Sequence, residues 1–504
     1  MLLELHCHSK KHSKCSQTEA QDLINYAINK DLSGLVFTDH GYLWSNEELE
    51  SLRNQFGIDK HFLLLSAQEV NTDIGHVVVY GADKSLDGEY KLSDLRAQYP
   101  DAAFVWAHPF RKGANPPDEK LLSKNLDAIE IFSSNHTIKE NYLGLKTWHR
   151  LKFNAVSGSD AHIADKAGLF PTIFDHPVTN IKDIAEEIKR GHCRPFYKEK
   201  QLSGANITVT EVVIGTKGIP ERRERIIIKK SDNDKSWHKL KETSLTARDF
   251  LSKNFTDKNY RIPQIYEIED SDRTIMEEGQ RGERLSKLFL HVGSQSRKKY
   301  FTLSAKWLAK LHSYKIQTSV NTVEEAERRR LERYRRVFEE NRTKYSGVIL
   351  DAVEKVAEKE FRGYFKQKEK FIFLHGDYHP GNIIIGQDDS KDPSSVFVSV
   401  IDFNNSINYV KEFDIGYFLA QYQSQFSHDK ELLKILTQEL FLNAYFDGKL
   451  ASVKQINDIM FFKVRGYLSI AAFFQSLGMG ESDKIEFIAG DIAKTLSENK
   501  EIFK

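Results

Sequence analysis

The stretch His375-Gly376-Asp377-Tyr378-His379-Pro380-Gly381-Asn382 decides the fold expected for the second half of this 504-residue chain. It follows the strand-like apolar run Phe371–Leu374, and Asp402 lies twenty residues beyond Asn382, at the end of a second apolar run. Phosphoryl transfer to a hydroxyl group needs a carboxylate near the acceptor proton and oxygen ligands for Mg²⁺. We therefore predict Asp377 as the catalytic base and Asn382 and Asp402 as the Mg²⁺ ligands.

The same Asp-x-x-x-x-Asn spacing occurs in protein kinases. The full string closely resembles the aminoglycoside phosphotransferases and the related choline and small-molecule kinases. This resemblance implies a bilobal, protein-kinase-like α+β domain that binds Mg²⁺ and ATP, or GTP, and phosphorylates a hydroxyl-bearing small molecule. We place the domain at residues 199–504, with an N-lobe at 199–280 and a C-lobe at 281–504.

Segments upstream resemble the nucleotide-binding parts of the same family. The loop at 202–206, with Gly204, resembles its short nucleotide loop, and Ile226-Ile227-Ile228-Lys229 resembles the strand that bears the phosphate-binding lysine. The resemblance implies Lys229 as that lysine, with Lys230 as the alternative if the strand register shifts. Glu242 opens the next helix and would pair with Lys229, and Glu277 lies in a segment that resembles the hinge that meets adenine.

The first half of the chain alternates short apolar runs with amphipathic helical patterns. One such helix is expected to open at the capping-box pattern Ser16-Gln17-Thr18-Glu19 and to run to about Lys30. Repeated strand–helix alternation predicts an α/β domain with a largely parallel sheet, of which a barrel is one form. We expect the boundary between the two halves near Pro195–Leu202. The expected strands are Leu2–Leu5, Gly34–Thr38, Phe62–Ser66, His76–Tyr80, Ala103–Ala107, Ala128–Phe132 and Asn154–Ser157.

Histidines and acids gather at the ends of these expected strands. In α/β barrels the carboxyl ends of the strands form the rim where functional side chains converge. Alternation along the first strand places His6 and His8 on the same side. A mixture of His, Asp and Glu suits Zn²⁺, Mn²⁺ or Fe²⁺, and a set of this size can hold more than one ion. Such ions polarise a phosphoryl oxygen and produce hydroxide near neutral pH.

These strand ends resemble the PHP (polymerase and histidinol phosphatase) family and follow its order. The matching segments are Leu5-His6-Cys7-His8-Ser9, Phe37-Thr38-Asp39-His40-Gly41, the strand end at Glu69, Gly75-His76-Val77, Ala107-His108-Pro109 and Gly158-Ser159-Asp160-Ala161-His162. The resemblance implies a distorted (β/α)7 barrel over residues 1–198, two or three metal ions and phosphoesterase chemistry. The ligands implied by position are His6, His8, His40, Glu69, His76, His108, Asp160 and His162.

Several neighbours of this set have open roles. His76 is also a candidate proton donor or a packing residue, and His12 is an alternative ligand although its spacing departs from the family. Asp39 is expected to orient His40, and Glu130 is expected to support a ligand rather than to bind metal. The lysines Lys10, Lys11 and Lys14 either bind substrate phosphate or are simply solvated, and solvation is favoured.

Composition limits the partners. Lys and Arg number 73 and Asp and Glu number 72, so the formal net charge is +1 and provides no global field for nucleic acid or an acidic membrane. The basic run Glu327–Arg336 is interpreted as a solvated helix face rather than a phosphate-binding patch. The three cysteines form no disulfide framework, the N-terminus does not resemble a signal peptide, and no apolar stretch is long enough for a spanning helix. We therefore expect a cytoplasmic protein without a membrane segment.

The favoured hypothesis is a bifunctional enzyme, in which a metal-dependent phosphoesterase is joined to an ATP-dependent kinase. One alternative is nucleic-acid end processing, with a nuclease or phosphatase beside a polynucleotide kinase. The other is a single catalytic domain regulated by a nucleotide- or metal-binding module, including a degenerate kinase that binds nucleotide without transferring phosphate. Oligomeric state and the identity of the acceptor are not encoded in recognisable motifs.

Overall fold

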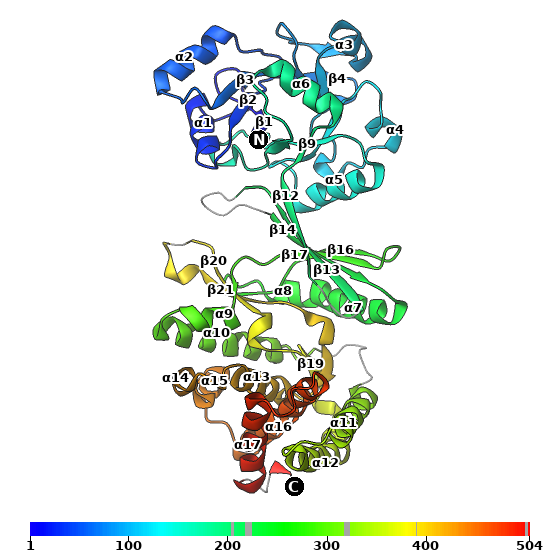
Figure 1. Ribbon diagram of the computed structural model, residues 1–504, viewed down its shortest axis with the longest axis vertical. Coiled ribbons are helices and arrows are strands. Elements are labelled where there is room, and N and C mark those ends of the chain that lie inside the picture. The colour runs from blue at the N-terminus through cyan, green and yellow to red at the C-terminus, as the bar shows by residue number, and fades with distance from the viewer. Residues whose placement is uncertain (203–205, 217–223, 317–322, 390, 499–501, 504) are drawn as a thin grey trace. The chain divides into compact units, whose positions relative to one another are not determined.

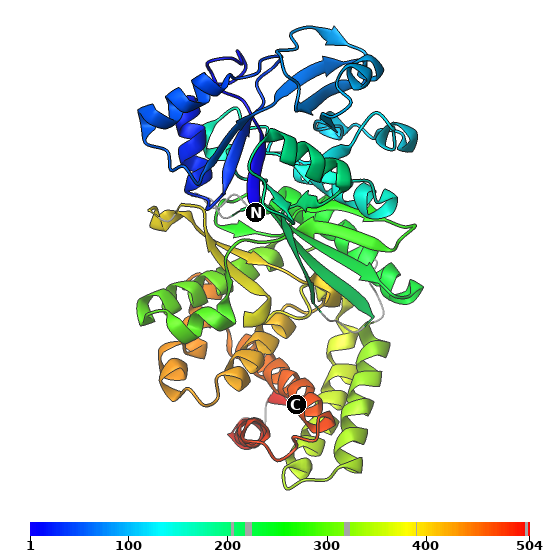
Figure 2. The same ribbon diagram turned by 45° about the horizontal axis from the view of Figure 1, so that its top comes forward.

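The computed structural model describes residues 1–202, 206–216, 224–316, 323–389, 391–498 and 502–503 (Figure 1). The chain divides into two compact units, one of Met1–Leu202 with Val209–Ile228 and the other centred on Lys229–Lys504. The same ribbon is seen from a second direction in Figure 2. The domain boundary expected at residue 198 stays a prediction.

The first unit contains a five-stranded sheet in the order β11-β10-β1-β2-β3. Strands β1, β2 and β3 run parallel, whereas β10 runs antiparallel to both β1 and β11. The residues of β2 are all buried, as expected for a strand covered on both faces. The bounds are β1 Leu2–Cys7, β2 Gly34–Phe37, β3 Leu63–Ser66, β10 Thr172–Phe174 and β11 Cys193–Pro195.

The first unit also contains a six-stranded sheet in the order β6-β4-β5-β7-β8-β9. Strands β7, β8 and β9 are parallel, but β4 and β5 form an antiparallel hairpin and β5 is antiparallel to β7. Isolated parallel bridges join Cys7 to Ala161 and His40 to Glu69. The bounds are β4 Gln68–Thr72, β5 Gly75–Tyr80, β6 Glu89–Tyr90, β7 Ala103–Trp106, β8 Ala128–Phe132 and β9 Ala155–Ser157.

The mixed α/β content of this unit agrees with the expected class. Most strand pairs are parallel, as expected, but the pairs β1–β10, β10–β11, β4–β5 and β5–β7 are antiparallel, so both sheets are mixed. The closed seven-stranded barrel stays a prediction. The helices of the unit are α1 Ala20–Ile28, α2 Asn46–Phe56, α3 Leu92–Gln98, α4 Asp118–Leu121, α5 Ile138–Leu151 and α6 Ile181–Arg190.

The helix expected from the capping-box pattern begins at Ala20, and no side chain caps its N-terminus. The hydroxyl of Ser16 donates to the carbonyl oxygen of His8 at 2.7 Å, and the hydroxyl of Thr18 donates to that of His162 at 3.2 Å. These hydroxyls therefore fix the backbone near two candidate metal ligands instead of capping the helix.

Strands are concentrated in the first part of the second half and helices in the rest. A five-stranded sheet has the order β12-β13-β14-β17-β16, and a four-stranded sheet has the order β15-β21-β20-β18. Strands β19 and β22 form a separate antiparallel pair. The bounds are β12 Tyr197–Leu202, β13 Ile207–Ile214, β14 Glu224–Ser231, β15 Tyr260–Arg261, β16 Ile265–Glu269, β17 Thr274–Glu278, β18 Glu283–Arg284, β19 Ile372–Leu374, β20 Ile383–Gln387, β21 Val396–Val400 and β22 Ile407–Tyr409.

The helices of the second unit surround two apolar cores, and α11 and α12 lie side by side in both ribbon views (Figure 1 and Figure 2). None of the described helices is both long and apolar enough to cross a membrane. The bounds are α7 Asp234–Thr246, α8 Ser252–Asn254, α9 Leu285–His291, α10 Ser294–Ser313, α11 Val323–Glu340, α12 Ser346–Arg362, α13 Glu412–Gln425, α14 Lys430–Ile435, α15 Gln438–Tyr445, α16 Val453–Ser476 and α17 Asp483–Glu498.

Helices α13 and α16 pack at very close range because glycines lie at their contact. A Cβ atom on Gly416 would lie 2.6 Å from the backbone nitrogen of Lys463, and one on Gly466 would lie 2.8 Å from the Cβ atom of Ala420. The contact fixes the position of α13, which carries two side chains, Asp414 and Tyr417, that reach the candidate catalytic loop.

The Gly416→Ala substitution should lower the free energy of unfolding by about 1–3 kcal/mol, because the added methyl group has no space between the two helices. Gly490 in α17 is the matched control, since a Cβ atom there meets nothing within 4 Å. Gly490→Ala should raise stability by up to about 1 kcal/mol through helix propensity. Scanning calorimetry of the full chain measures both, and equal effects at the two positions would contradict the packing argument.

Candidate metal centre and phosphoryl-transfer site

The first unit brings all eight predicted ligands together at the ends of neighbouring strands. The most central ones are almost inaccessible, with 1% exposure for His6, 0% for His8, 2% for Glu69 and 1% for Asp160. Their positions are His6 in β1, His8 just after β1, His40 after β2, Glu69 in β4, His76 in β5, His108 after β7, and Asp160 and His162 after β9.

Glu69 is the hub of this cluster. Its two carboxylate oxygens face imidazole nitrogens that come from four different strand ends. Glu69 Oε2 lies 3.2 Å from His8 Nε2, 3.2 Å from His40 Nδ1 and 3.6 Å from His6 Nε2. Glu69 Oε1 lies 2.8 Å from His76 Nδ1 and 3.1 Å from His108 Nε2.

Asp160 is the second carboxylate of the cluster. Its Oδ1 lies 3.2 Å from His8 Nε2 and 3.4 Å from His162 Nδ1, and its Oδ2 lies 3.7 Å from a guanidinium nitrogen of Arg111. The backbone of Asp160 has a φ of 46° and that of His108 a φ of 35°, in the left-handed region that side chains rarely adopt. Such strain is typical of functional positions.

The charges of the cluster favour ionised carboxylates. Burial alone would raise the pKa of Glu69, but the facing imidazoles, His6 foremost, outweigh it and hold this pKa well below its usual value. Burial alone would lower the pKa of His8, but hydrogen bonds to Asp160 and Glu69 raise it to about 9. Burial lowers the pKa of His40 to about 4. Two anionic groups thus face a shell of imidazoles whose nitrogens converge, with His6 Nε2 and His8 Nε2 only 3.2 Å apart.

Carboxylates behind the cluster orient its ligands. Glu130 Oε1 lies 3.0 Å from His6 Nδ1, and its Oε2 accepts the backbone N–H of His108 at 2.8 Å. This is the supporting position expected for Glu130. Asp39 accepts the hydroxyl of Ser13 at 2.6 Å, and Ser13 Oγ in turn accepts the backbone N–H of His40 at 3.1 Å. Asp39 therefore reaches the backbone of His40 through Ser13.

The alternative ligand His12 lies outside the cluster. Its ring stacks on Tyr42 with centroids 3.6 Å apart, and its Nε2 lies 3.3 Å from Glu48. Among the neighbouring lysines, Lys11 also pairs with Glu48, and Lys10 pairs with Glu19. These side chains therefore have surface partners within the described chain.

The donors of the cluster fit divalent cations. Three groups of side chains place their ligand atoms within 4.8 Å of one another: His8 with His40 and His162, His6 with His8 and Asp160, and His40 with Glu69 and His76. Mixed imidazole nitrogens and carboxylate oxygens suit Zn²⁺, Mn²⁺ or Fe²⁺. The second and third groups share no residue, so their donors could hold two ions at the same time.

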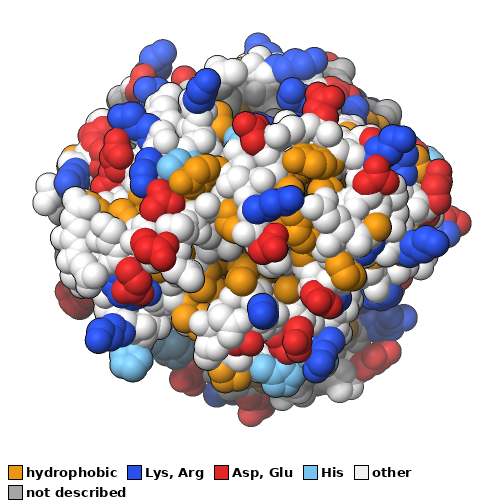
Figure 3. All heavy atoms as spheres, turned by 90° about the horizontal axis from the view of Figure 1, so that it is seen from above, with side chains coloured by type: hydrophobic (Ala, Val, Ile, Leu, Met, Phe, Trp, Pro, Cys, Tyr) orange, Lys and Arg blue, Asp and Glu red, His pale blue; other side chains and the backbone are white. Residues whose placement is uncertain are grey.

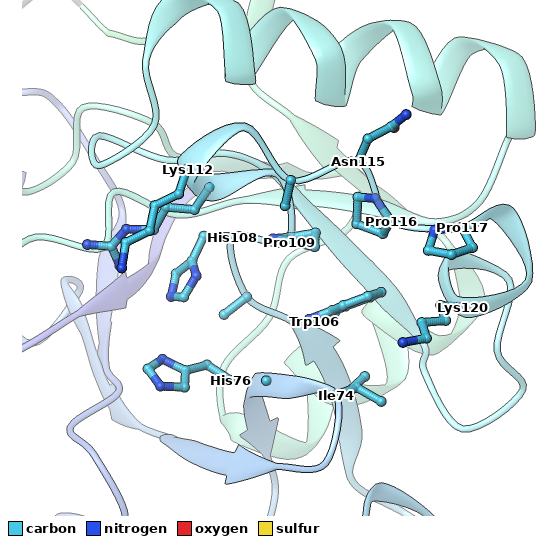
Figure 4. Close-up of a pocket in the computed structure, with 14 residues that line it drawn as sticks. Ile74, His76, Trp106, His108, Pro109, Lys112, Asn115, Pro116, Pro117 and Lys120 are labelled. Carbon is cyan, nitrogen blue, oxygen red and sulfur yellow. The ribbon is translucent and has the colours of Figure 1, made fainter.

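A pocket of about 540 Å³ adjoins this cluster (Figure 4). His76 and His108 lie on one side of it, and Arg111, Lys112 and Lys120 add positive charge. Its apolar lining comes from Ile74, Trp106, Pro109, Pro116 and Pro117. The sequence analysis missed Arg111 and Lys112, although they follow the His108 motif within four residues.

The second unit places Asp377 at the centre of a hydrogen-bonded loop. Its Oδ1 accepts the hydroxyl of Tyr417 at 2.9 Å, and its Oδ2 accepts the side-chain amide of Asn405 at 3.3 Å. The side-chain amide of Asn382 donates to the backbone oxygen of Asp377 at 3.1 Å. Two of the three predicted residues are thus directly linked.

Asp414 holds the start of this loop. It is fully buried, and its two oxygens accept the backbone N–H groups of His375 and Gly376, each at 2.9 Å. Gly376 has a φ of 76°, and a Cβ atom there would lie 2.1 Å from the backbone oxygen of Asn405. Asp414 therefore fixes the start of the candidate catalytic loop.

Lys229 lies beside the third predicted residue, Asp402. Its ammonium group is 2.9 Å from Glu277 Oε1 and 4.0 Å from Asp402 Oδ1. Burial alone would lower the pKa of Lys229, but the two carboxylates outweigh it and raise this pKa. Asp402 has a φ of 68°, and its Oδ1 is buried without a hydrogen-bond donor among the described residues. That unpartnered oxygen fits a cation ligand.

Three other residues were predicted to take part in nucleotide binding. Glu277 was expected near adenine, but its carboxylate contacts the lysine that was expected to bind phosphate. Glu242 lies on α7, half-buried, and Gly204 falls outside the described residues. Lys229, Glu277 and Asp402 line one small pocket together with Ile262 and Phe403, among others.

The basic run of the sequence forms part of α11 and has acidic partners on the same helix. Arg328 pairs with Glu324, Arg329 with Glu325, and Arg335 with Glu339. Figure 3 shows lysine and arginine side chains interspersed with acidic ones over the face seen from above. Nucleic acid is not supported as a partner.

Residues 260–449 match the phosphotransferase enzyme family, and residues 139–193 match the PHP-associated family. The second half of the chain therefore carries a phosphotransferase-family segment, and the first half carries a PHP-associated segment. No curated protein matches the chain.

Three solved structures illustrate the likeness. Plasmodium vivax ethanolamine kinase is 17% identical, with 60% of this chain and 82% of that chain covered and a TM-score of 0.39. Aminoglycoside phosphotransferase APH(2'')-Ib with ADP is 18% identical, with coverages of 61% and 94% and a TM-score of 0.37. Choline kinase LicA from Streptococcus pneumoniae is 14% identical, with coverages of 60% and 92% and a TM-score of 0.37.

Glu130→Gln should weaken metal binding by about 10- to 100-fold, because it removes the carboxylate that orients His6 without removing a predicted ligand. The measurement is ion content of the full chain after equilibrium dialysis against Zn²⁺ or Mn²⁺. Glu119→Gln, at an exposed carboxylate of α4, is the control and should change nothing. Unchanged affinity in Glu130→Gln would contradict the orienting role.

Proposed function

We propose that the chain is a bifunctional enzyme. Residues 1–198 would form a metal-dependent phosphoesterase of the PHP type, and residues 199–504 an ATP- or GTP-dependent kinase for a hydroxyl-bearing small molecule. The kinase proposal is supported most strongly by the direct linkage of Asp377, Asn382, Asn405 and Tyr417 within the matched family region. A cytoplasmic location is part of the proposal.

In the kinase reaction, Asp377 takes the proton of the acceptor hydroxyl as the oxygen–phosphorus bond forms and the nucleoside diphosphate leaves. The donors Tyr417 and Asn405 fix both oxygens of this carboxylate and so set its direction. Lys229 neutralises phosphate charge, and Glu277 holds its ammonium group in place. Mg²⁺ bound by Asn382 and Asp402 would supply further charge neutralisation at the phosphates.

In the phosphoesterase reaction, the eight-residue cluster would hold two or three divalent ions. Such ions polarise the phosphoryl oxygen and lower the pKa of bound water. Arg111 and Lys112 are suited to bind the phosphate of the ester, because both line the pocket that adjoins the cluster. His76 and His108 lie between that pocket and Glu69.

One substitution in each unit should abolish one proposed activity, phosphoryl transfer or phosphoester hydrolysis, and leave the other intact. Asp377→Asn should lower phosphoryl transfer by at least about 100-fold, because the variant lacks the base, while hydrolysis of a generic phosphomonoester stays at the wild-type rate. Asp160→Ala should show the reverse pattern. Retention of kinase activity in Asp377→Asn would refute the kinase assignment, and retention of hydrolysis in Asp160→Ala would refute the phosphoesterase assignment.

Tyr417→Phe should lower kcat of phosphoryl transfer by about tenfold, which corresponds to one lost hydrogen bond to a charged group. Burial and the nearby Asp377 carboxylate raise the pKa of Tyr417, so its hydroxyl stays protonated and donates throughout the working pH range. KM for ATP should stay unchanged. Tyr422→Phe, on the same helix but away from Asp377, is the control. Equal kcat values for both variants would contradict this role.

A further inference from the structure

A second group of metal-binding side chains lies in the first unit, apart from the candidate metal centre. It consists of His176, Glu187 and His192, whose ligand atoms all lie within 4.8 Å of one another. His176 Nδ1 lies 2.9 Å from Glu187 Oε2, and His192 Nδ1 lies 3.3 Å from Glu187 Oε1. None of the three belongs to the centre around Glu69.

The topology places this group at the opposite end of β1 from His6 and His8. Strand β10 runs antiparallel to β1, with Ile173 opposite Leu2, so the chain after β10 continues past the start of β1. His6 lies four positions after Leu2, which is about 13 Å along a strand. The two groups of ligands therefore serve different sites.

Three separate backbone segments hold the ligands in position. Glu187 lies in the last turn of α6, His192 follows the helix end at Gly191, and His176 follows β10. The backbone N–H of His192 donates to the backbone carbonyl oxygen of Glu187 at 2.9 Å. The backbone N–H of Asp175 donates to the backbone carbonyl oxygen of His192 at 3.0 Å. The ligands are thus preorganised by the helix end and by the β10–β11 ladder.

The three residues can offer one ligand atom each within 4.8 Å of one another. The nitrogen–oxygen distances of 2.9 and 3.3 Å run to different oxygens of Glu187 and are shorter than the about 3.4 Å between ligands that lie about 2.0–2.1 Å from a tetrahedral Zn²⁺, so an ion between them needs only small side-chain shifts. The exposed fractions of 60% for His176 and 41% for His192 leave room for a water molecule as the fourth ligand.

Nearby cations face other partners. The ammonium group of Lys189 donates to the backbone oxygens of Pro100 and Asp101, and Arg190 pairs with Glu186. Burial tends to raise the pKa of Glu187, but hydrogen bonds to the two imidazoles outweigh it and lower this pKa, so the carboxylate is ionised at neutral pH.

We propose that His176, Glu187 and His192 form a separate Zn²⁺ site that fastens the end of α6 to the β10–β11 ladder. Both imidazoles bind through Nδ1, and their ring protons reside on Nε2 when the ion is present. Two nitrogen donors out of three favour Zn²⁺ over Mg²⁺ or Ca²⁺. This site is independent of the proposed enzymatic activities.

The test is Zn²⁺ titration of the demetallated full-length protein, with bound ions counted by native mass spectrometry. The His176→Ala/His192→Ala variant should bind one ion fewer than the wild type. The control His61→Ala/His149→Ala, which removes two exposed histidines elsewhere in the unit, should keep the wild-type number. Equal ion numbers in the wild type and the His176→Ala/His192→Ala variant would overturn the proposal.

A second variant separates loss of the ion from loss of the fold. Glu187→Gln keeps the size of the side chain but removes its charge and one of its two acceptor oxygens, and it should weaken the additional Zn²⁺ site at least tenfold. Its far-ultraviolet circular dichroism should match the wild type. An unchanged affinity for that ion in Glu187→Gln would also overturn the proposal.

Discussion

A buried carboxylate organises each of the two candidate sites. The rest of each site depends on the partners that offset the lost hydration of this carboxylate. Removing a carboxylate from water costs several kcal/mol unless partners replace the lost hydration. Glu69 has five imidazoles within 3.6 Å, and Asp414 has two backbone N–H groups at 2.9 Å. In the first unit the carboxylate collects ligands from separate strands, and in the second it fixes the loop that carries Asp377.

The two sites differ in donor chemistry. The site around Glu69 is rich in imidazole nitrogen, which suits Zn²⁺, Mn²⁺ or Fe²⁺, whereas Asn382 and Asp402 offer oxygen, which Mg²⁺ prefers. This difference agrees with the proposed division of labour, in which one unit hydrolyses a phosphate ester and the other transfers phosphate from a nucleotide.

Residues in short contiguous motifs were predictable from the sequence. His6 and His8 share a strand end, and Asp377 and Asn382 share one loop, so local spacing was enough to group each pair. The convergence of the strand ends in the first unit was also predictable, but the individual partners of side chains from distant segments were not. Glu277 faces Lys229 because β14 and β17 are neighbours in one sheet, and Tyr417 reaches Asp377 because α13 packs on α16 through Gly416. The capping-box pattern failed because tertiary contacts to His8 and His162 compete for the hydroxyls of Ser16 and Thr18.

The most direct test of the account is anomalous diffraction from crystals grown with a non-hydrolysable ATP analogue, Mg²⁺ and a transition metal. The account predicts anomalous peaks for two or three ions among His6, His8, Glu69 and Asp160, and nucleotide density beside Lys229 and Asp402. An absence of anomalous signal around Glu69, or nucleotide bound away from Lys229, would contradict it.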